Sequence, residues 1–96
     1  MSKKREKSAG GVVILHPRDN VAVAIREIKE GEDLYLQKND SQIQLRVRNR
    51  IPLGHKVSLT KIEKEKPVIK YGETIGKAIK DIGAGEHVHV HNLSDH

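Results

Sequence analysis

The chain of 96 residues has no cysteine, phenylalanine or tryptophan, and it has two tyrosines. The absence of cysteine excludes disulfides and thiolate metal ligands. No apolar run approaches the roughly 20 residues that a membrane-spanning helix needs, and no apolar signal segment follows the basic N-terminus. We therefore expect no membrane partner and a cytoplasmic location.

The net charge of +5 is concentrated at the N-terminus. Lys3, Lys4, Arg5 and Lys7, offset by Glu6, account for +3 of it. The remaining chain has no aromatic platform for stacking bases beyond its two tyrosines, and no recognition-helix pattern. A solvated basic tail is therefore favoured over nucleic-acid binding, and no nucleic-acid partner is expected.

The apolar residues that are present are mostly Ile, Val and Leu, a composition that favours β-sheet. We expect a disordered basic arm at 1–11, one folded domain at 12–92 and a C-terminal tail at 93–96. Residues 41–49 alternate apolar and polar side chains, as in a half-buried strand. A helical bundle or a βαβ unit fits such short, closely spaced strands poorly. The predicted fold is mostly β and compact, with short helical or 3-10 turns.

An internal repeat supports this prediction. Residues 22–36 align without gaps on residues 76–90, with identical residues at five positions, and a weaker copy lies at 59–69. In each copy we expect a short helical turn that ends at an isoleucine, then a tight turn, then a strand. The helical turns are placed near 22–28 and 75–81.

Local chemistry refines the repeat. Gly31 and Gly85 are predicted to adopt a positive φ in the tight turns. Asp19 and Asn20 precede the first predicted helical turn and are expected to cap it.

The segment 85–92, Gly-Glu-His-Val-His-Val-His-Asn, is predicted to be a strand. Side chains alternate faces in a strand, which places three histidines on one face and two valines on the other, packed inside. Same-face neighbours lie about 6.5–7 Å apart at their Cα atoms. Two imidazoles at that spacing can share a metal ion or grip an anionic substrate. The residues concerned are His87, His89 and His91 on the outer face, and Val88 and Val90 on the inner face.

Several motifs then resemble, in order, the N-terminal domain of the altronate and galactarate dehydratase family. The small subunit of sulfolactate sulfo-lyase has the same pattern. The likeness covers about residues 12–92 and implies the SAF-type β-clip fold. The matching motifs occupy residues 16–24, 54–56, 68–72, 75–76 and 85–92.

The resemblance also implies a partner. In the dehydratases a long catalytic region follows this domain, whereas the present sequence ends at His96. We therefore expect the small SAF subunit of a two-subunit carbon–oxygen or carbon–sulfur lyase, inactive alone and paired with a separately encoded large subunit. The alternative is a non-catalytic SAF module that binds a ligand or organises a partner.

Dehydration of a sugar acid removes a proton α to a carboxylate and expels a β-hydroxyl. The reaction needs a base, an acid and positive charge near the carboxylate. His87, His89 and His91 are the candidate catalytic residues. The family implies iron, or a similar divalent metal such as manganese, shared with the large subunit, and His89 and His91 are its candidate ligands.

Four further residues are candidates for binding a small acidic substrate. His55 follows a glycine in a predicted loop, where its side chain can reach a site. Lys70, like Lys56, can hold a carboxylate as a point charge. His16 suits substrate contact and turn hydrogen bonding equally well. The full predicted substrate-binding set is His55, Lys70, Asn92 and His16.

Overall fold

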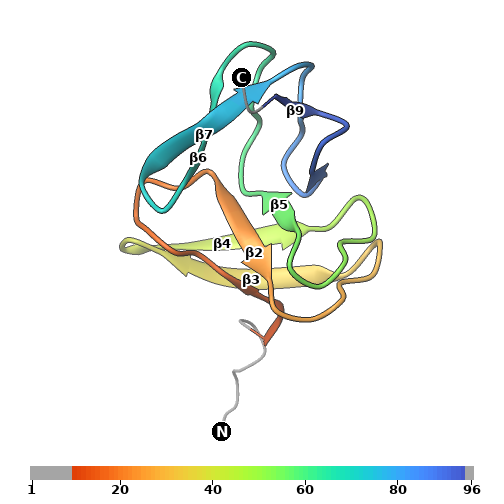
Figure 1. Cartoon of the computed structure of the whole chain (residues 1–96). Helices are drawn as coiled ribbons and strands as arrows, with labels where there is room; N and C mark the ends of the chain where they lie inside the picture. The colour runs from red at the N-terminus through yellow and green to blue at the C-terminus, as the bar shows by residue number, and fades with distance from the viewer. Residues whose placement is uncertain (1–9, 95–96) are drawn as a thin grey trace, which may run out of the picture.

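The computed structural model describes residues 10–94, in which nine short strands form three antiparallel sheets (Figure 1). The first sheet has the strand order β1-β2-β5-β8, the second is the β3-β4 hairpin, and the third has the order β6-β7-β9. The mostly β prediction is therefore confirmed. The strands are β1 (Val12–Val13), β2 (Val21–Ala24), β3 (Asp33–Lys38), β4 (Ser41–Arg46), β5 (Lys56–Ser58), β6 (Pro67–Lys70), β7 (Glu73–Ala78), β8 (His87–Val88) and β9 (Leu93–Ser94).

The two chain ends compare with the predicted boundaries as follows. Residues 1–9 of the predicted disordered arm, and residues 95–96 of the predicted tail, lie outside the described residues. Residues 93–94, also assigned to the tail, form β9 and pair with β7. Among residues 10–94, no helix has the length and apolar character needed to span a membrane.

The helical turns predicted near 22–28 and 75–81 are wrong, because β2 and β7 occupy these segments. The Val-Ala-Val-Ala sequence of β2 pairs with β1 on one side and β5 on the other. The four-residue spacing from Ala24 to Ile28 resembles a helical period, but the strand ends at Ala24. The chain then bends, and Ile28 forms an isolated β-bridge with Ile51. A strand followed by a bridge thus produced the apparent helical spacing.

One local structure occurs four times along the chain. A buried isoleucine is followed three residues later by a residue with a φ between 76 and 89°, and six residues later by a buried Leu or Val. A backbone hydrogen bond closes each four-residue turn, and a positive φ at its third position is typical of a type II turn. The four sets are Ile28–Gly31–Leu34, Ile51–Gly54–Val57, Ile62–Glu65–Val68 and Ile82–Gly85–Val88.

The positive φ predicted for Gly31 and Gly85 is confirmed, at 89° in both residues. The isoleucines pair in twos, Ile28 with Ile51 and Ile62 with Ile82, which joins the repeats back to back. The repeat that contains Ile51 was missed in the sequence, because it shares only its isoleucine, glycine and valine with the others.

Two hydrophobic clusters form the core. β2 contributes to both, with Ala22 and Ala24 in the first cluster and Val21 in the second. Val57 of β5 belongs to the first cluster and Val88 of β8 to the second, although the two strands pair. The first sheet therefore connects the two clusters. The candidate site described below lies beside its paired strands β5 and β8.

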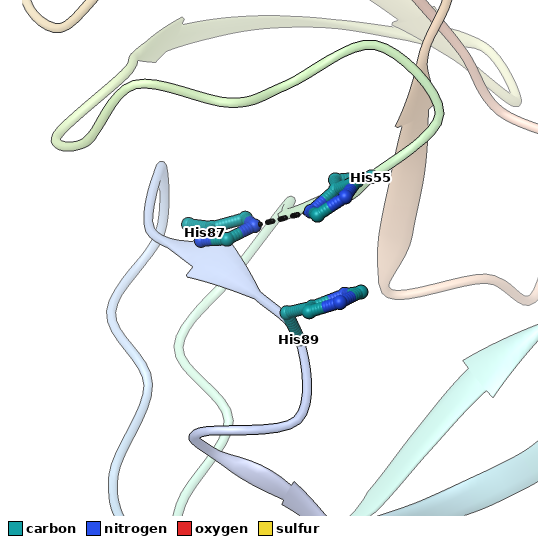
Figure 2. A group of neighbouring side chains, drawn as sticks. All are labelled: His55, His87 and His89. Carbon is teal, nitrogen blue, oxygen red and sulfur yellow. Dashed lines mark hydrogen bonds between the residues drawn. The ribbon is translucent and has the colours of Figure 1, made fainter.

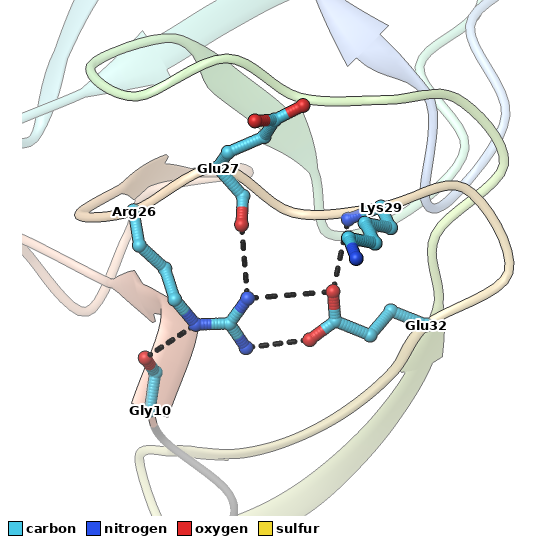
Figure 3. Close-up of polar contacts among 5 residues, drawn as sticks. All are labelled: Gly10, Arg26, Glu27, Lys29 and Glu32. Carbon is cyan, nitrogen blue, oxygen red and sulfur yellow. Dashed lines mark hydrogen bonds and ion pairs between the residues drawn. The ribbon is translucent and has the colours of Figure 1, made fainter.

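Arg26 holds the first described residues against the first turn (Figure 3). Its guanidinium donates hydrogen bonds to the carbonyl oxygens of Gly10 and Glu27 and to the carboxylate of Glu32. Glu32 also accepts a hydrogen bond from the Lys29 amide at 2.9 Å. The hydrogen bond from Arg26 lowers the pKa of the Glu32 carboxyl. Because such partly exposed pairs contribute at most about 1 kcal/mol, this network orders a turn rather than the fold.

The prediction that Asp19 and Asn20 cap a helical turn is wrong, because they fasten the β6–β7 hairpin to the start of β2. The buried Asp19 carboxylate accepts hydrogen bonds from the amides of Tyr71 and Gly72 at 3.0 and 2.8 Å. The Asn20 side-chain oxygen accepts one from the Ile69 amide at 2.8 Å. Lys70 lies between these anchored amides, so its backbone position is fixed relative to β2.

Candidate functional site

Three histidines from two distant parts of the chain come together beside the β5–β8 pair (Figure 2). His55 ends the turn that precedes β5, and His87 is the first residue of β8. Val57 lies opposite His87 in the antiparallel register, which brings the start of β5 next to β8. His89 follows β8 directly. We call His55, His87 and His89 the histidine cluster.

The three rings lie nearly parallel. The His55 and His89 ring centroids are 4.0 Å apart with planes at 17°, and His87 lies 5.1 Å from His55. Nδ1 of His55 and Nε2 of His87 form a hydrogen bond of 2.9 Å, in which one nitrogen carries the proton and the other accepts it (Figure 2). The cluster can therefore hold a proton between two imidazoles.

The surroundings favour the neutral form of His55 and His87. Burial, and then the neighbouring His91, His55, His89 and Lys56, lower the pKa of His87 to about 4. Partial burial, followed by His89 and nearby cations, lowers the pKa of His55 as well. At neutral pH the two imidazoles consequently keep a lone pair available for a proton, a metal or a substrate hydroxyl.

Two asparagines position the backbone of the cluster. Asn92 is buried, its side-chain oxygen accepts a hydrogen bond from the His89 amide at 3.0 Å, and its NH₂ group donates one to the His87 carbonyl at 2.8 Å. The exposed Asn49 side chain accepts a hydrogen bond from the His87 amide at 3.0 Å. The Asn92 amide, predicted to bind substrate, is thus committed to holding the segment that carries His87 and His89.

We expect Asn92→Ala to lower the free energy of unfolding by about 1–3 kcal/mol, since it leaves two part-buried backbone groups without their side-chain partner. The denaturation midpoint in urea measures the effect. Asn49→Ala is the matched control, because Asn49 is exposed and water can replace its oxygen. Equal midpoints for the two variants would show that Asn92 has no special positioning role.

The segment 85–92 is not the continuous strand that the alternation predicted. β8 ends at Val88, and the chain turns through residues 89–92. Val88 is buried as predicted, but Val90 is 79% exposed, so the prediction that Val90 packs inside is wrong. The physical reason is the Asn92 side chain, which closes a turn onto the His89 amide and stops the strand.

This turn also separates His91 from the histidine cluster. His91 is exposed, and its ring lies 5.2 Å from that of His87 with a tilt of 33°. The structure thus brings His87 and His89 together with His55, and places His91 beside His87 at the outer edge.

His16 and Lys70, the other predicted site residues, lie near the β6–β7 hairpin. The half-buried His16 ring packs against Gly72, and its Nδ1 accepts a hydrogen bond from the Arg18 amide at 3.1 Å. This is the turn-forming role that the sequence also allowed. Lys70 is the half-buried last residue of β6.

Sequence reasoning did not identify Asn49 or Arg50 as neighbours of the cluster. Arg50, which pairs with Glu27, is close enough for its charge to lower the pKa of His55. Their positions follow from the loop after β4, where the Arg48 amide donates a hydrogen bond to the Gly85 carbonyl. No motif in the sequence signals this long-range pairing.

The histidine cluster suits a divalent metal. Its three candidate ligand nitrogens lie within 4.8 Å of one another, and imidazole binds iron, manganese and zinc. Two nitrogens bound to one ion at about 2.1 Å lie roughly 3.0 Å apart at a right angle and roughly 3.4 Å apart in a tetrahedral site. The distance of 2.9 Å between the His55 and His87 nitrogens is close to the first of these values. His89 offers the third nitrogen of this group.

These features define a small antiparallel β domain with a cluster of three histidines beside two paired strands. The chain belongs to the family of altronate/galactarate dehydratase SAF domains, whose family model matches residues 10–96.

Individual relatives agree with this assignment. The altronate dehydratase of Escherichia coli (strain K12) is 46% identical over 78 residues, which cover 81% of this chain and 15% of that enzyme. The altronate dehydratase of Bacillus subtilis (strain 168) is 41% identical over 78 residues, with the same coverage of each chain. The (2R)-sulfolactate sulfo-lyase subunit alpha of Chromohalobacter salexigens is 33% identical over 84 residues, covering 83% of this chain and 89% of that subunit. The chain therefore spans a small part of the dehydratases and most of the sulfo-lyase subunit.

Proposed function

We propose that this chain is the small SAF-domain subunit of a two-subunit lyase that acts on a sugar acid or a similar hydroxy acid. The single observation that carries the proposal is the histidine cluster, which lies in a domain shared with altronate dehydratases and a sulfo-lyase subunit. Either water or sulfite is the leaving group. A cytoplasmic location belongs to the same proposal.

The chain's own residues supply proton chemistry. A neutral imidazole accepts the proton α to the substrate carboxylate, and the imidazolium formed in this way donates a proton to the leaving group. The hydrogen bond between His55 Nδ1 and His87 Nε2 provides a place where one proton is held between the two rings. His89, stacked on His55 at 4.0 Å, limits the rotation of that ring.

A divalent metal is the proposed cofactor, iron or manganese in the first instance. His55, His87 and His89 would hold it, in place of the His89 and His91 pair that the alternation suggested. The ion would replace the proton between His55 and His87, so the proton transfers described above belong to the site without the ion. When bound, the ion would supply positive charge for the substrate carboxylate and the leaving oxygen. No carboxylate of residues 10–94 belongs to this ligand group, so further ligands would come from the large subunit or from substrate.

Two exposed apolar side chains, close in sequence to members of the histidine cluster, support a partner bound near the cluster. Val90, between His89 and His91, is 79% exposed, and Leu53, two residues before His55, is 66% exposed. The equivalents of Leu53 in the other three turns are Glu30, Lys64 and Ala84. A large apolar residue at this turn position costs solubility unless a partner covers it. The proposed occupant is the large catalytic subunit.

The test is reconstitution. The purified chain alone is expected to show no turnover of altronate, galactarate or (2R)-sulfolactate, because a shallow site on a small domain lacks the rest of the catalytic machinery. Addition of the large subunit should produce turnover, measured as release of the 2-keto product or of sulfite. Substantial turnover by the chain alone, or none after a stable complex has formed, would contradict the proposal. The second result would favour a non-catalytic binding module.

A further inference from the structure

Tyr71 has a backbone conformation that a bulky side chain rarely adopts. It is the first residue of the two-residue turn between β6 and β7, with a φ of 58°, and Gly72 follows with a φ of 74°. Lys70 and Glu73 pair on either side of the turn, and a positive φ at both central residues is typical of type I′. Asparagine and glycine are favoured there, whereas a bulky residue with a positive φ is a genuine outlier.

Among the described residues, two further non-glycine residues have a positive φ, and the side chain explains each. Asn39 has the same position in the two-residue turn between β3 and β4, where asparagine is tolerated. Glu65 stands where the other repeated turns have glycine, and its carboxylate forms an ion pair of 3.0 Å with Lys77. The Tyr71 side chain is 64% exposed, and its hydroxyl forms no hydrogen bond with another residue of 10–94. The turn itself therefore gives no reason for a tyrosine.

The segment 16–19 holds the turn in this conformation. The carboxylate of Asp19, a residue that is 1% exposed, accepts hydrogen bonds from the Tyr71 and Gly72 amides. A Cβ atom added at Gly72 would lie 2.8–2.9 Å from three atoms of the His16 ring, so this position has no room for a side chain. The Tyr71 ring is therefore exposed on a turn whose backbone is fixed.

An exposed aromatic ring on a fixed turn suits insertion into a pocket of another protein. Tyrosine and arginine are enriched among the residues that dominate binding at interfaces, and a side chain that is already positioned loses little freedom on binding. Pro17 and Arg18, exposed in the segment just before Asp19, border the same surface. A small-molecule ligand fits less well, because such ligands bind in concave sites and Tyr71 lies at the end of a hairpin.

We propose that Tyr71 is an anchor residue that inserts into a pocket of the large catalytic subunit. The identity of this partner rests on the function proposed above. The matched region makes up 15% of each altronate dehydratase, so the remaining part of those enzymes is large enough to cover the turn. Contact with such a part explains why tyrosine occupies a position that suits asparagine, because binding sites commonly retain residues that reduce the stability of the isolated fold.

The first experiment maps tyrosine exposure by nitration with tetranitromethane. It compares the isolated full chain with a chimera of the E. coli altronate dehydratase in which this chain's matching region replaces that of the enzyme. The chain has two tyrosines, and trypsin places them in the separate peptides 30–38 and 71–77, which mass spectrometry quantifies. We expect Tyr71 to react about tenfold or more slowly in the chimera, because its pocket encloses the ring. Tyr35, 44% exposed on β3, is the internal control and should react at a nearly unchanged rate.

The second experiment uses Tyr71→Asn, which removes the ring but suits the turn. In the isolated chain the urea midpoint should stay the same or rise, because asparagine tolerates a positive φ better than tyrosine does. In the chimera the same substitution should lower the urea midpoint, because the contact between the ring and its pocket is lost. Tyr71→Phe is the matched control, since it keeps the ring and should behave like the unmodified protein in both backgrounds.

Equal nitration rates of Tyr71 in the isolated chain and the chimera would overturn the inference, and so would equal protection of both tyrosines. A lower urea midpoint for Tyr71→Asn in the isolated chain would mark the ring as structural and would also overturn it. So would protection of Tyr71 that grows with the concentration of the isolated chain, since the occupant would then be a second copy. Protection of Tyr71 without lyase turnover in the reconstituted complex would refute the proposed function alone. Turnover by that complex without protection of Tyr71 would refute only the anchor.

Discussion

Replacing His55 or His89 by glutamine is expected to lower lyase turnover by about 100-fold or more. His55 is a proposed acid–base group, which typically contributes at least that much, and His89 holds the His55 ring in place. The assay uses a chimera of the E. coli altronate dehydratase in which the matching 78-residue region is replaced by that of this chain. The parent chimera must first dehydrate altronate. Glutamine keeps a polar side chain of similar length but cannot take up a proton at neutral pH.

His91→Gln is the control within the same motif. His91 shares the alternating pattern of His87 and His89, but it lies outside the histidine cluster and is exposed. Its replacement should cost much less than that of His55, which is more than 30 residues away in the sequence. This order of effects is the opposite of what the alternating pattern alone predicts.

Metal binding by the isolated chain provides a readout that does not depend on turnover. Titration calorimetry with iron(II), manganese(II) or zinc(II) should show weaker binding for His55→Gln, His87→Gln and His89→Gln. His91→Gln should bind like the unmodified chain. If His91→Gln loses turnover and metal as fully as His89→Gln, the metal ligands include His91 and the assignment of His55 is wrong.

The fold could be predicted as far as local chemistry determines it. β-branched composition and the alternation in 41–49 correctly indicated sheet, and the glycines of the repeat marked two turns with positive φ. The helical turns predicted near 22–28 and 75–81 were wrong because the sequence does not distinguish a helical turn from a short strand followed by a bend. At Ile28 and Ile82 that choice depends on bridges to Ile51 and Ile62, which lie 20 or more residues away.

The candidate site was predictable in part for the same reason. The histidine-rich segment and the Gly-His pair at 54–55 are both visible as motifs, but nothing in the sequence says that they meet. Their meeting depends on the antiparallel register in which Lys56 lies opposite Val88 and Val57 opposite His87. The predicted strand over 85–92 is too long. The alternating pattern continues beyond Val88, but the chain turns there because the Asn92 side chain binds the His89 amide.

Val88→Asp and Val90→Asp test whether β8 ends at Val88. Val88→Asp has the largest expected effect on stability. The two valines are two residues apart and have the same place in the alternating pattern, but Val88 is fully buried in the second core cluster and Val90 is 79% exposed. A carboxylate at Val88 would be buried without a partner, at a cost of about 4 kcal/mol or more. Domains of this size are stable by only about 5–15 kcal/mol, so we expect Val88→Asp to lose a large share of its stability, seen as a much lower midpoint in urea titrations followed by circular dichroism.

Val90→Asp should change the free energy of unfolding by no more than about 0.5 kcal/mol, because its side chain stays in water. In the chimera the same substitution has a second, separable effect. A charge placed between His89 and His91 on the face proposed for the large catalytic region should weaken turnover without unfolding the domain. If Val88→Asp and Val90→Asp destabilise the isolated chain equally, segment 85–92 is a continuous strand with both valines inside, and the turn closed by Asn92 does not exist in solution.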